Sequence, residues 1–513
     1  MDISRGALRA ISAAFVAVAL LLAGCTSGAA SPRTPSPTKA ATRAALAAYY
    51  EQKLSWHECR GGAGFECATL KAPLDYARPD DGHDLKLAVS RKKASGPGKR
   101  LGSLMVNPGG PGGSAIDYLQ SYAGIGYPAR VRARYDLVAM DPRGVAASEP
   151  VTCLGDKQMD AFTQTDQTPD APAETRSLVA SYQKFARGCA ARSGEILGHV
   201  STVEAARDMD LLREVLGDRK LTYVGASYGT FLGATYADLF PRRVGRLVLD
   251  GALDPALTSE QINRDQTAGF ETAFTAFAKD CVRRTSCPLG TRDVPQARER
   301  LTAFFTRLDT HPVPTGESRR LGESLATTGV LAALYDEGAW PQLRTALRSA
   351  MRGDGSGLLT LADLYYERDG DGSYANLMYA NPAVNCLDLP PAFRTPADVR
   401  KSLPAFQKAS PVFGKALAWS ALNCAYWPVH PTGTPHPLHA KGAAPIVVVG
   451  TTRDPATPYT WARALASQLT SATLLTYNGD GHTAYGRGSA CIDTAIDTYL
   501  LTGTPPPSGK RCT

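Results

Sequence analysis

Six short apolar runs, each ending in a loop rich in glycine, proline or aspartate, place the strongest constraint on how this 513-residue chain folds. They alternate with helical stretches such as residues 201–217, where Ser201 and Glu204 are spaced as a capping box. Strand and helix alternation predicts a parallel sheet covered by helices on both faces. The six runs are residues 103–110, 135–144, 221–225, 246–251, 444–455 and 472–482. Their loops follow the carboxyl ends of strands, which is the edge where an open α/β sheet binds ligands.

Between residues 256 and 440 this alternation stops. The stretch contains helical patterns, including ETAFTAFAKDC at 271–281, together with proline-rich breaks and few apolar runs. We therefore expect residues 256–440 to form a helical cap inserted between two halves of one sheet domain. The halves are residues 46–255 and residues 441–513.

The first 24 residues have the features of a signal peptide. Arg5 and Arg9 precede the apolar run AISAAFVAVALLLAG, which is short for a membrane span and ends in small residues. LAGC at 22–25 resembles the lipobox of bacterial lipoproteins, which predicts that Cys25 is acylated after cleavage; an ordinary secretory signal is the alternative. Residues 25–45, rich in Ser, Thr, Pro and Ala, are expected to be a flexible linker. We expect an exported, membrane-anchored protein that faces outward, and release of some of it to the medium stays open.

The cysteines also indicate export. The chain has 11, and setting aside Cys25 leaves ten, an even number suited to five disulfides. None lies in a C-x-x-C arrangement, which argues against a zinc site or a thioredoxin-like redox centre. Sequence alone does not fix connectivity, but spacing favours five local pairs. These pairs are Cys59 with Cys67, Cys153 with Cys189, Cys281 with Cys287, Cys386 with Cys424, and Cys491 with Cys512.

Composition narrows the class of protein. The chain is 43% hydrophobic and 20% charged, so it can bury a large core, and its formal net charge is +8. Its basic residues are scattered among acids, and the longest basic run is RKK at 91–93, which favours a solvated surface over nucleic-acid binding. The sequence has no H-E-x-x-H and no dinucleotide fingerprint, so we expect neither a metal nor an organic cofactor.

One loop contains the pattern G-x-S-x-G. Residues 225–229, GASYG, lie between the strand pattern of 221–225 and helical residues that follow. In this pattern the strand turns sharply into the helix, and small flanking residues let the serine hydroxyl stand above the sheet. We therefore predict that Ser227 is a nucleophile rather than part of a plain tight turn. A serine needs a base to take its proton and donors to stabilise the oxyanion.

The base and its orienting acid are expected late in the chain, in the order Ser, Asp, His. Of eight histidines, only His482 lies in a glycine-framed loop just beyond a late strand, in NGDGHTAYG. Asp454 follows the preceding strand and is the predicted acid, with Thr457 as a hydrogen-bonding neighbour of its carboxylate. Asp480 is a rival acid, but its position two residues before the histidine favours a role in shaping the turn.

The oxyanion hole is expected to use two backbone N–H groups. One belongs to Tyr228, directly after the predicted nucleophile. The other comes from the loop NPGGPGGS at 107–114, where Gly110 is the first choice and Gly109 the near alternative. A phosphate-binding loop is disfavoured, because the stretch has no G-K-[ST] and Pro111 has no N–H to donate.

These motifs in this order resemble the α/β-hydrolases of the proline iminopeptidase and tripeptidyl aminopeptidase group, especially the secreted actinobacterial members with a TAP-like C-terminal region. The resemblance also includes WHECRGGAGFECATLKAPLDYARP at 56–79 and covers nearly all of the exported chain. Its matching motifs are GGPGG at 109–113, DPRGVAAS at 141–148, GASYGT at 225–230, VLDGALDP at 248–255, TTRDPATP at 451–458 and GDGHTAYG at 479–486. One departure is Ala146, where relatives usually have glycine, which affects packing beside the site.

The resemblance implies a serine exopeptidase that cuts an amide near the free N-terminus of a peptide substrate. Such an enzyme needs an anion for the substrate's ammonium group, and we expect this carboxylate to project from the cap. Asp388 in AVNCLDLP, fixed beside Cys386, is the candidate. A carboxylesterase or lipase-like enzyme with the same triad is the main alternative, and a non-catalytic surface binding protein is the lesser one. The oligomeric state stays open.

Overall fold

The computed structural model describes residues 44–60, 62–96 and 98–513. The predicted signal peptide, Cys25 and nearly all of the predicted linker lie outside these described residues. Within them, no helix is long and apolar enough to cross a membrane.

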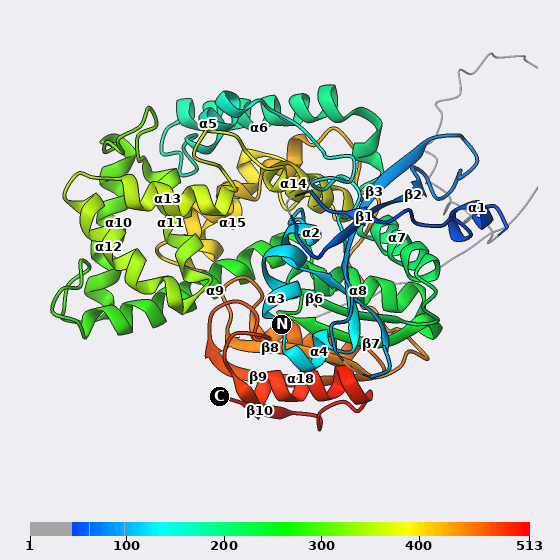
Figure 1. Ribbon diagram of the computed structural model, residues 1–513. Coiled ribbons are helices and arrows are strands. Elements are labelled where there is room, and N and C mark those ends of the chain that lie inside the picture. The colour runs from blue at the N-terminus through cyan, green and yellow to red at the C-terminus, as the bar shows by residue number, and fades with distance from the viewer. Residues whose placement is uncertain (1–43, 61, 97) are drawn as a thin grey trace, which may run out of the picture. The chain divides into compact units, whose positions relative to one another are not determined.

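The described residues form a ten-stranded sheet with the order β1-β2-β3-β5-β4-β6-β7-β8-β9-β10 (Figure 1). The first three strands run antiparallel to their neighbours, and the strands from β5 to β10 in this order pair in parallel. The sheet is therefore mostly parallel, as the sequence pattern predicted. The strands are β1 (His57–Glu58), β2 (Glu66–Pro73), β3 (Asp84–Lys92), β4 (Gly102–Asn107), β5 (Tyr135–Met140), β6 (Leu221–Ala226), β7 (Val244–Asp250), β8 (Ile446–Arg453), β9 (Ala472–Asp480) and β10 (Lys510–Cys512).

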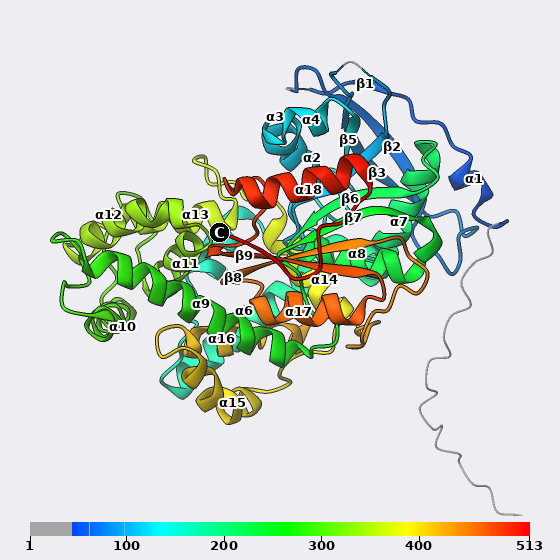
Figure 2. The same cartoon turned by 90° about the horizontal axis from the view of Figure 1, so that it is seen from below.

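Helices cover both faces of this sheet, as Figure 2 shows. One face is covered by α1 (Ala47–Tyr50), α7 (Thr202–Val215), α8 (Tyr228–Leu239) and α17 (Tyr459–Gln468). The other is covered by α2 (Ala115–Tyr118), η1 (Leu119–Ala123), α3 (Gly124–Gly126), α4 (Ala129–Arg132) and α18 (Ala490–Thr502). Helix α7 begins as the capping box predicted, because the Ser201 side chain accepts from the Glu204 N–H. Each face has its own hydrophobic core against the sheet. This is the α/β-hydrolase fold expected from the sequence.

Between β7 and β8 the chain forms helices, of which those within residues 259–366 pack around a separate hydrophobic core together with Phe413. Figure 1 shows most of them gathered beside the sheet domain. The helix predicted from residues 271–281 is part of α9. The set is α9 (Ser259–Val282), α10 (Val294–Thr310), α11 (Glu323–Leu334), η4 (Glu337–Ala339), α12 (Trp340–Met351), α13 (Ser356–Tyr366), α14 (Leu377–Asp388), α15 (Pro396–Ala409), α16 (Gly414–Ser420) and η5 (Asn423–Tyr426).

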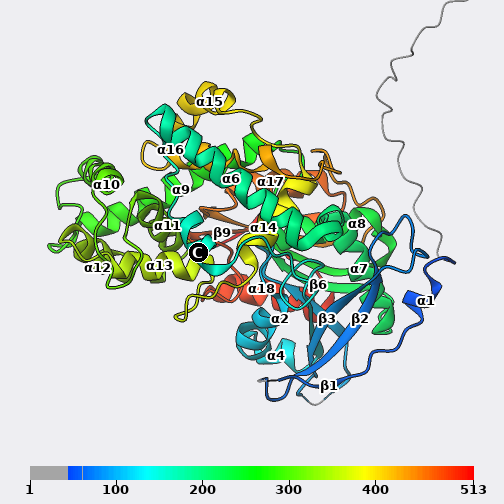
Figure 3. The ribbon, with the colours of Figure 1, turned by 90° about the horizontal axis from the view of Figure 1, so that it is seen from above.

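Two earlier helices also pack against this helical region, which the sequence pattern did not indicate. They are α5 (Asp156–Thr163) and α6 (Pro172–Ser193), which follow β5 and precede η2 (Gly194–Gly198). Figure 3 shows α6 lying along α16. Leu178 and Tyr182 of α6 share a small core with Phe406 and Trp419, and the Tyr182 hydroxyl donates to the Trp419 carbonyl at 3.2 Å. The apolar spacing of α6 predicts a helix but does not identify its partner.

Five disulfides join Cys59–Cys67, Cys153–Cys189, Cys281–Cys287, Cys386–Cys424 and Cys491–Cys512. These are the local pairs that the spacing favoured. The Cys386–Cys424 bond joins α14 to η5, two segments that lie far apart in sequence. Five disulfides indicate an exported protein, because such bonds persist in oxidising compartments.

Candidate active site

The carboxyl ends of neighbouring strands bring the predicted site residues to one edge of the sheet. Ser227 follows β6, Asp454 follows β8, His482 follows β9 by two residues, and the glycine loop follows β4. Since β4, β6, β7, β8 and β9 are consecutive in the sheet, their loops are neighbours. The end of β7 contacts both the Ser227 turn and the His482 loop. The Asp250 carbonyl accepts from the Ser227 N–H at 2.9 Å, and a Cβ added to Gly251 would lie 3.3 Å from His482 Cε1.

Ser227 occupies the sharp turn between β6 and α8. Its backbone has φ 55° and ψ −125°, which few residues other than glycine adopt. The turn is tight enough to need the glycine before it, because a Cβ on Gly225 would lie 2.3 Å from the Gly229 carbonyl oxygen. The pattern GASYG therefore has a geometric reason here. A strained, non-glycine φ at this position is the conformation expected of a nucleophile elbow.

His482 and Asp454 are in direct contact. The Nδ1 of His482 lies 2.9 Å from one Asp454 carboxylate oxygen and 3.0 Å from the other. The buried carboxylate also accepts three backbone N–H groups, from Ala456, Thr457 and Thr483. These bonds fix the carboxylate in place, so its oxygens are aimed at the imidazole.

The other two predicted residues beside this pair make different contacts. Thr457 reaches the Asp454 carboxylate through its backbone N–H at 2.8 Å, while its hydroxyl lies 3.4 Å from His482 Nδ1. Asp480, the rival acid, forms a two-pronged ion pair with Arg453 at 2.7 and 2.9 Å. The acid in contact with the histidine ring is therefore Asp454.

The glycine loop after β4 lies against the Ser227 turn. A Cβ on Gly109, whose φ is +95°, would lie 2.5 Å from the Ala226 carbonyl oxygen and 2.9 Å from Ser227 Cβ. The Gly109 N–H donates to the Asn107 side chain, whereas the Gly110 N–H has no hydrogen-bond partner among the described residues. Tyr228 is the first residue of α8, so its N–H has no partner within the helix. The geometry favours Gly110 over Gly109 as a donor to a bound group.

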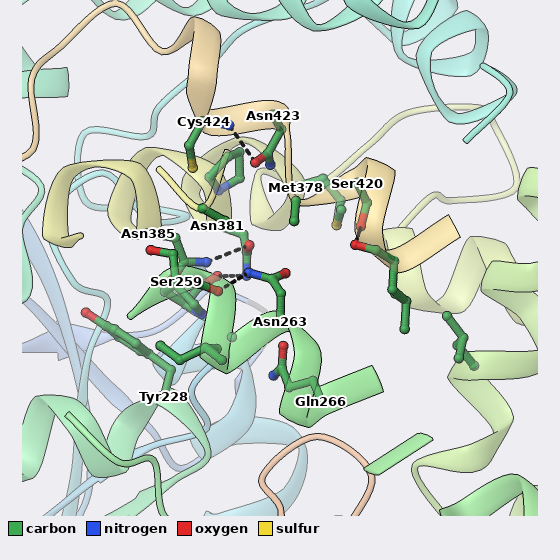
Figure 4. A pocket seen from close by; sticks show the side chains of 18 of the residues that line it. Tyr228, Ser259, Asn263, Gln266, Met378, Asn381, Asn385, Ser420, Asn423 and Cys424 are labelled. Atoms are coloured by element: carbon green, nitrogen blue, oxygen red, sulfur yellow. Dashed lines mark hydrogen bonds between the residues drawn. The ribbon is translucent and has the colours of Figure 1, made fainter. Parts of the chain in front are cut away.

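A cavity of about 440 Å³ opens at Ser227 and is lined by both the sheet domain and the helical region. Its lining includes apolar side chains, hydroxyl groups and six carboxamides, and Figure 4 shows carboxamide side chains from α9, α14 and η5. The carboxamides are Gln167, Asn263, Gln266, Asn381, Asn385 and Asn423. Three carboxylates, those of Asp254, Glu323 and Asp388, also line it, and its lining contains no lysine, arginine or histidine. A cavity with this lining suits a polar ligand that carries positive charge.

Asp388 lies at the last turn of α14 and lines this cavity, but its carboxylate is already bonded. One oxygen accepts from the Thr202 N–H at 2.8 Å, and the other accepts from the Thr202 hydroxyl at 2.5 Å. The same hydroxyl lies 2.6 Å from the Tyr228 hydroxyl. Burial raises the pKa of Asp388 to about 7, while the Thr202 hydrogen bonds oppose that shift.

Glu323, the first residue of α11, is a cavity carboxylate that sequence reasoning missed. It accepts from the Thr168 hydroxyl at 2.7 Å, and burial raises its pKa. No sequence signal marks it, because a glutamate in the first turn of a helix is common. Ala146, the departure from the family pattern, has φ 44° and donates its N–H to the Asn376 side chain at 2.7 Å.

In the part of the chain that the structure describes, two groups of three side chains have the spacing of metal ligands. They are Asp75 with His199 and Glu204, and Asp166 with Asp309 and Glu323. In the first, His199 Nδ1 lies 3.2 Å from the Glu204 carboxylate, which raises the pKa of the histidine and makes an internal ion pair. The second borders the cavity through Glu323. Neither includes Ser227, Asp454 or His482.

The chain is similar to known proteins along nearly its whole length. Residues 410–512 match the family described as TAP-like protein. The chain is 38% identical to the serine protease Hip1 of Mycobacterium tuberculosis, over 98% of this chain and 97% of that protein. It is 39% identical to carboxylesterase B of the same organism, over 98% of each. It is 32% identical to the tripeptidyl aminopeptidase of Streptomyces coelicolor, over 92% of this chain and 87% of that protein. With the sheet, the strained serine turn and the Asp454–His482 contact, this likeness along nearly the whole chain places it in the TAP-like family of α/β-hydrolase serine peptidases.

Proposed function

We propose that this serine peptidase acts through a triad of Ser227, His482 and Asp454. Ser227 attacks the scissile carbonyl carbon while His482 takes the hydroxyl proton, which it then passes to the leaving amine. Asp454 holds the imidazole with its Nδ1 proton facing the carboxylate and stabilises the imidazolium that forms. The acyl-enzyme is hydrolysed by water, which His482 activates in the same way.

The N–H groups of Gly110 and Tyr228 form the proposed oxyanion hole. Their support is that neither the Gly110 N–H, in the loop that lies against the Ser227 turn, nor the first N–H of α8 has a hydrogen-bond partner among the described residues. Donors that have no internal partner are available when negative charge develops on the carbonyl oxygen. No metal or organic cofactor takes part in this scheme.

The substrate we propose is a peptide with a free N-terminus. The observation that carries this proposal is the cavity lining, which offers three carboxylates and six carboxamides but no basic side chain. Carboxamides match the N–H and C=O groups of a peptide backbone, and the carboxylates favour its terminal ammonium group. The apolar side chains of the lining, such as Phe231 and Leu253, suit the side chains of a peptide and an acyl chain equally, so they do not distinguish the two substrates.

Asp388 is our candidate for the group that binds the ammonium. It lines the cavity from α14 and is buried, so a cation placed beside it would interact strongly and favour its ionised form. Glu323 is the second candidate, because its carboxylate has one hydrogen bond, from Thr168, among the described residues. Substitutions at the two positions distinguish them.

The test compares three substrates of the purified protein: a tripeptide chromogenic amide with a free amino group, its N-blocked analogue and a short-chain nitrophenyl ester. We expect the free amide to be cleaved at least about tenfold faster than the blocked one, since loss of one buried ion pair is worth 1.4 kcal/mol or more. If Asp388 binds the ammonium, Asp388→Asn should remove this preference for the free amide and Glu323→Gln should not. If Glu323 binds it, the reverse is expected. Rapid cleavage of the blocked amide and the ester, with the free amide untouched, would favour the esterase activity named for the 39% identical relative.

We also propose that the exported protein is held at the membrane through acylated Cys25. Support comes from the lipobox-like LAGC sequence and the linker-like residues 25–45. A Cys25→Ser variant expressed in the natural host should move from the membrane fraction to the soluble fraction. Membrane partitioning equal to that of the wild-type protein would contradict this anchor.

A further inference from the structure

We propose that the end of helix α11 and Arg487 form a latch that positions His482, so that the helical cap takes part in assembling the triad. The latch consists of Tyr335, Asp336 and Arg487. The inference rests on the proposed role of His482 as general base. It assigns no chemistry to the three residues, which act through the histidine.

The contacts of the latch hold both backbone polar groups of His482. Its N–H donates to the Tyr335 carbonyl at 2.8 Å, directly across to the cap. Its carbonyl accepts from Nη1 of Arg487 at 2.8 Å. Nη2 of the same guanidinium donates to the Asp336 carboxylate, also at 2.8 Å. Thus one route from His482 to the cap is direct, and the other passes through Arg487.

The side chains reinforce this arrangement. The Tyr335 ring lies edge-on to the His482 ring, with centroids 5.4 Å apart and planes at 87°. Tyr335 also packs against Phe270 of α9 and lines the substrate cavity. A shift of this end of α11 would therefore move a wall of the cavity and the histidine together.

The loop that carries His482 needs such support. The next residue, Thr483, has φ 66°, an unfavourable conformation for a β-branched residue. Asp454 fixes the ring from the sheet side, while the backbone of His482 is bonded to Tyr335 of the cap, to Arg487 and to the hydroxyl of the neighbouring Thr483. Because Asp336 is largely exposed, its ion pair with Arg487 contributes little to the free energy of unfolding. We expect the ion pair to affect the position of the His482 ring instead.

The test uses three variants, Arg487→Ala, Arg487→Lys and Asp336→Asn. Asp336→Asn keeps an oxygen for the Gly338 N–H that Asp336 now caps, so it removes the charge with little disturbance of the turn. For Arg487→Ala we expect kcat on the preferred amide to fall about tenfold or more with KM within about twofold, since a displacement of 1 Å can cost about a hundredfold. The apparent base pKa in the pH profile of kcat/KM should shift, and labelling of Ser227 by a fluorophosphonate should slow by a similar factor.

A smaller loss is expected for Asp336→Asn, and adding it to Arg487→Ala should change little, because both remove the same bridge. Arg284→Ala is the matched control: it removes a cap ion pair with Asp280 that does not approach His482, and its kcat should equal that of wild type. If Arg487→Ala does not fold, Arg487→Lys and Asp336→Asn decide the question.

A latch that only braces the fold would lower Tm in these variants and leave kcat, the pH profile and the labelling rate unchanged, and that result overturns the inference. A rise in KM alone would also overturn it, by placing Arg487 in substrate binding. Failure of the proposed triad is recognised separately, because wild type and His482→Ala would then be labelled equally fast.

Discussion

The strand-end loops and the helical cap build the same site in different ways. In the loops, Ser227 and Asp454 are fixed by backbone hydrogen bonds at the sheet edge, such as the one from the Ser227 N–H to the carbonyl at the end of β7, while His482 is in addition bonded to the cap. In the cap, the cavity side chains come from α9, α11, α14 and η5, and helix packing sets their positions. The comparison suggests that the reaction is specified by local backbone geometry and the choice of substrate by long-range packing.

The cap and the sheet with its loops also differ in their hydrophobic cores. The cap has a core of its own, centred on Phe274, Phe277 and Phe413, while the strands pack against helices on both faces in two other cores. A change in the cap core is therefore expected to move the cavity wall without unfolding the sheet. Substitutions in the two regions should separate turnover from substrate preference.

The largest effect is expected at the serine turn. Ser227→Ala should lower kcat by about 10⁴-fold or more on every substrate, amide or ester, because the nucleophile is lost. Its Tm should stay within a few degrees of wild type, since no side-chain hydrogen bond of Ser227 to a described residue is lost. Turnover of both amides and the ester under matched conditions tests this.

Full activity of Ser227→Ala on any of the three substrates would contradict the mechanism. A loss of activity on the peptide amide alone would contradict the division between loops and cap, because a loop residue would then determine which substrate is cleaved. The fold of the variant is checked by circular dichroism and by its melting transition.

A second large effect is expected in the glycine loop. Gly109→Ala would place a Cβ 2.8 Å from the Tyr228 N, forcing the loop away from the serine turn. If this displaces the oxyanion donors, kcat should fall by about 10²- to 10³-fold, the cost of losing one such donor. The measurement is kcat on the preferred amide alongside the free energy of unfolding.

Gly82→Ala is the matched control for backbone strain. Gly82 has φ +82°, close to that of Gly109, but an added Cβ there has no atom within 4 Å. It should lower stability slightly and leave kcat unchanged. Equal losses of kcat in both variants would mean that strain, and not the clash, is responsible.

The sequence predicts the sheet and its strand-end loops better than it predicts the cap. The sheet and the places of Ser227, Asp454 and His482 could be predicted, because periodicity and glycine turns are local signals and parallel strands bring their carboxyl ends to one edge. Choosing Asp454 over Asp480 was also possible, since a residue directly after a strand can reach the next loop. The partner of Asp480, Arg453, was not predicted.

The cap could be predicted only as helical material. That α6 packs on α16 depends on a shared core of residues far apart in sequence, such as Tyr182 and Trp419. Glu323 and the carboxamides of the cavity have no motif, because helix packing alone brings them together. The carboxylate of Asp388 and its neighbour Cys386 make it a candidate from sequence, but no sequence signal indicates its bonds to Thr202.

Asp388→Asn tests the cap through pH. The pKa of Asp388 is raised by burial to about 7, so the folded protein holds a proton that the unfolded chain releases near pH 4. The Asp388 contribution is then fully present below about pH 4 and is lost as the pH rises through 7, by up to about 4 kcal/mol in the free energy of unfolding. In Asp388→Asn this loss should be absent. Urea unfolding of both proteins at pH 4.5, 6 and 8 measures it, and a constant difference between them would show that the carboxyl has an ordinary pKa.

The smallest effect is expected where the two regions meet, at Ala146. Its left-handed backbone, φ 44°, costs a residue with a Cβ about 1–2 kcal/mol, and its N–H binds the Asn376 side chain just before α14. Ala146→Gly removes the strain but adds about 0.4–1 kcal/mol of freedom to the unfolded chain, so a net gain of up to about 1 kcal/mol in unfolding free energy is expected, with kcat unchanged. Ala147→Gly is the control, because the φ of Ala147 is not positive and only the entropic loss applies. A gain in unfolding free energy for Ala146→Gly together with a loss for Ala147→Gly would locate the strain at Ala146. Equal losses in both variants would show that the Ala146 backbone, where it contacts Asn376, is not strained.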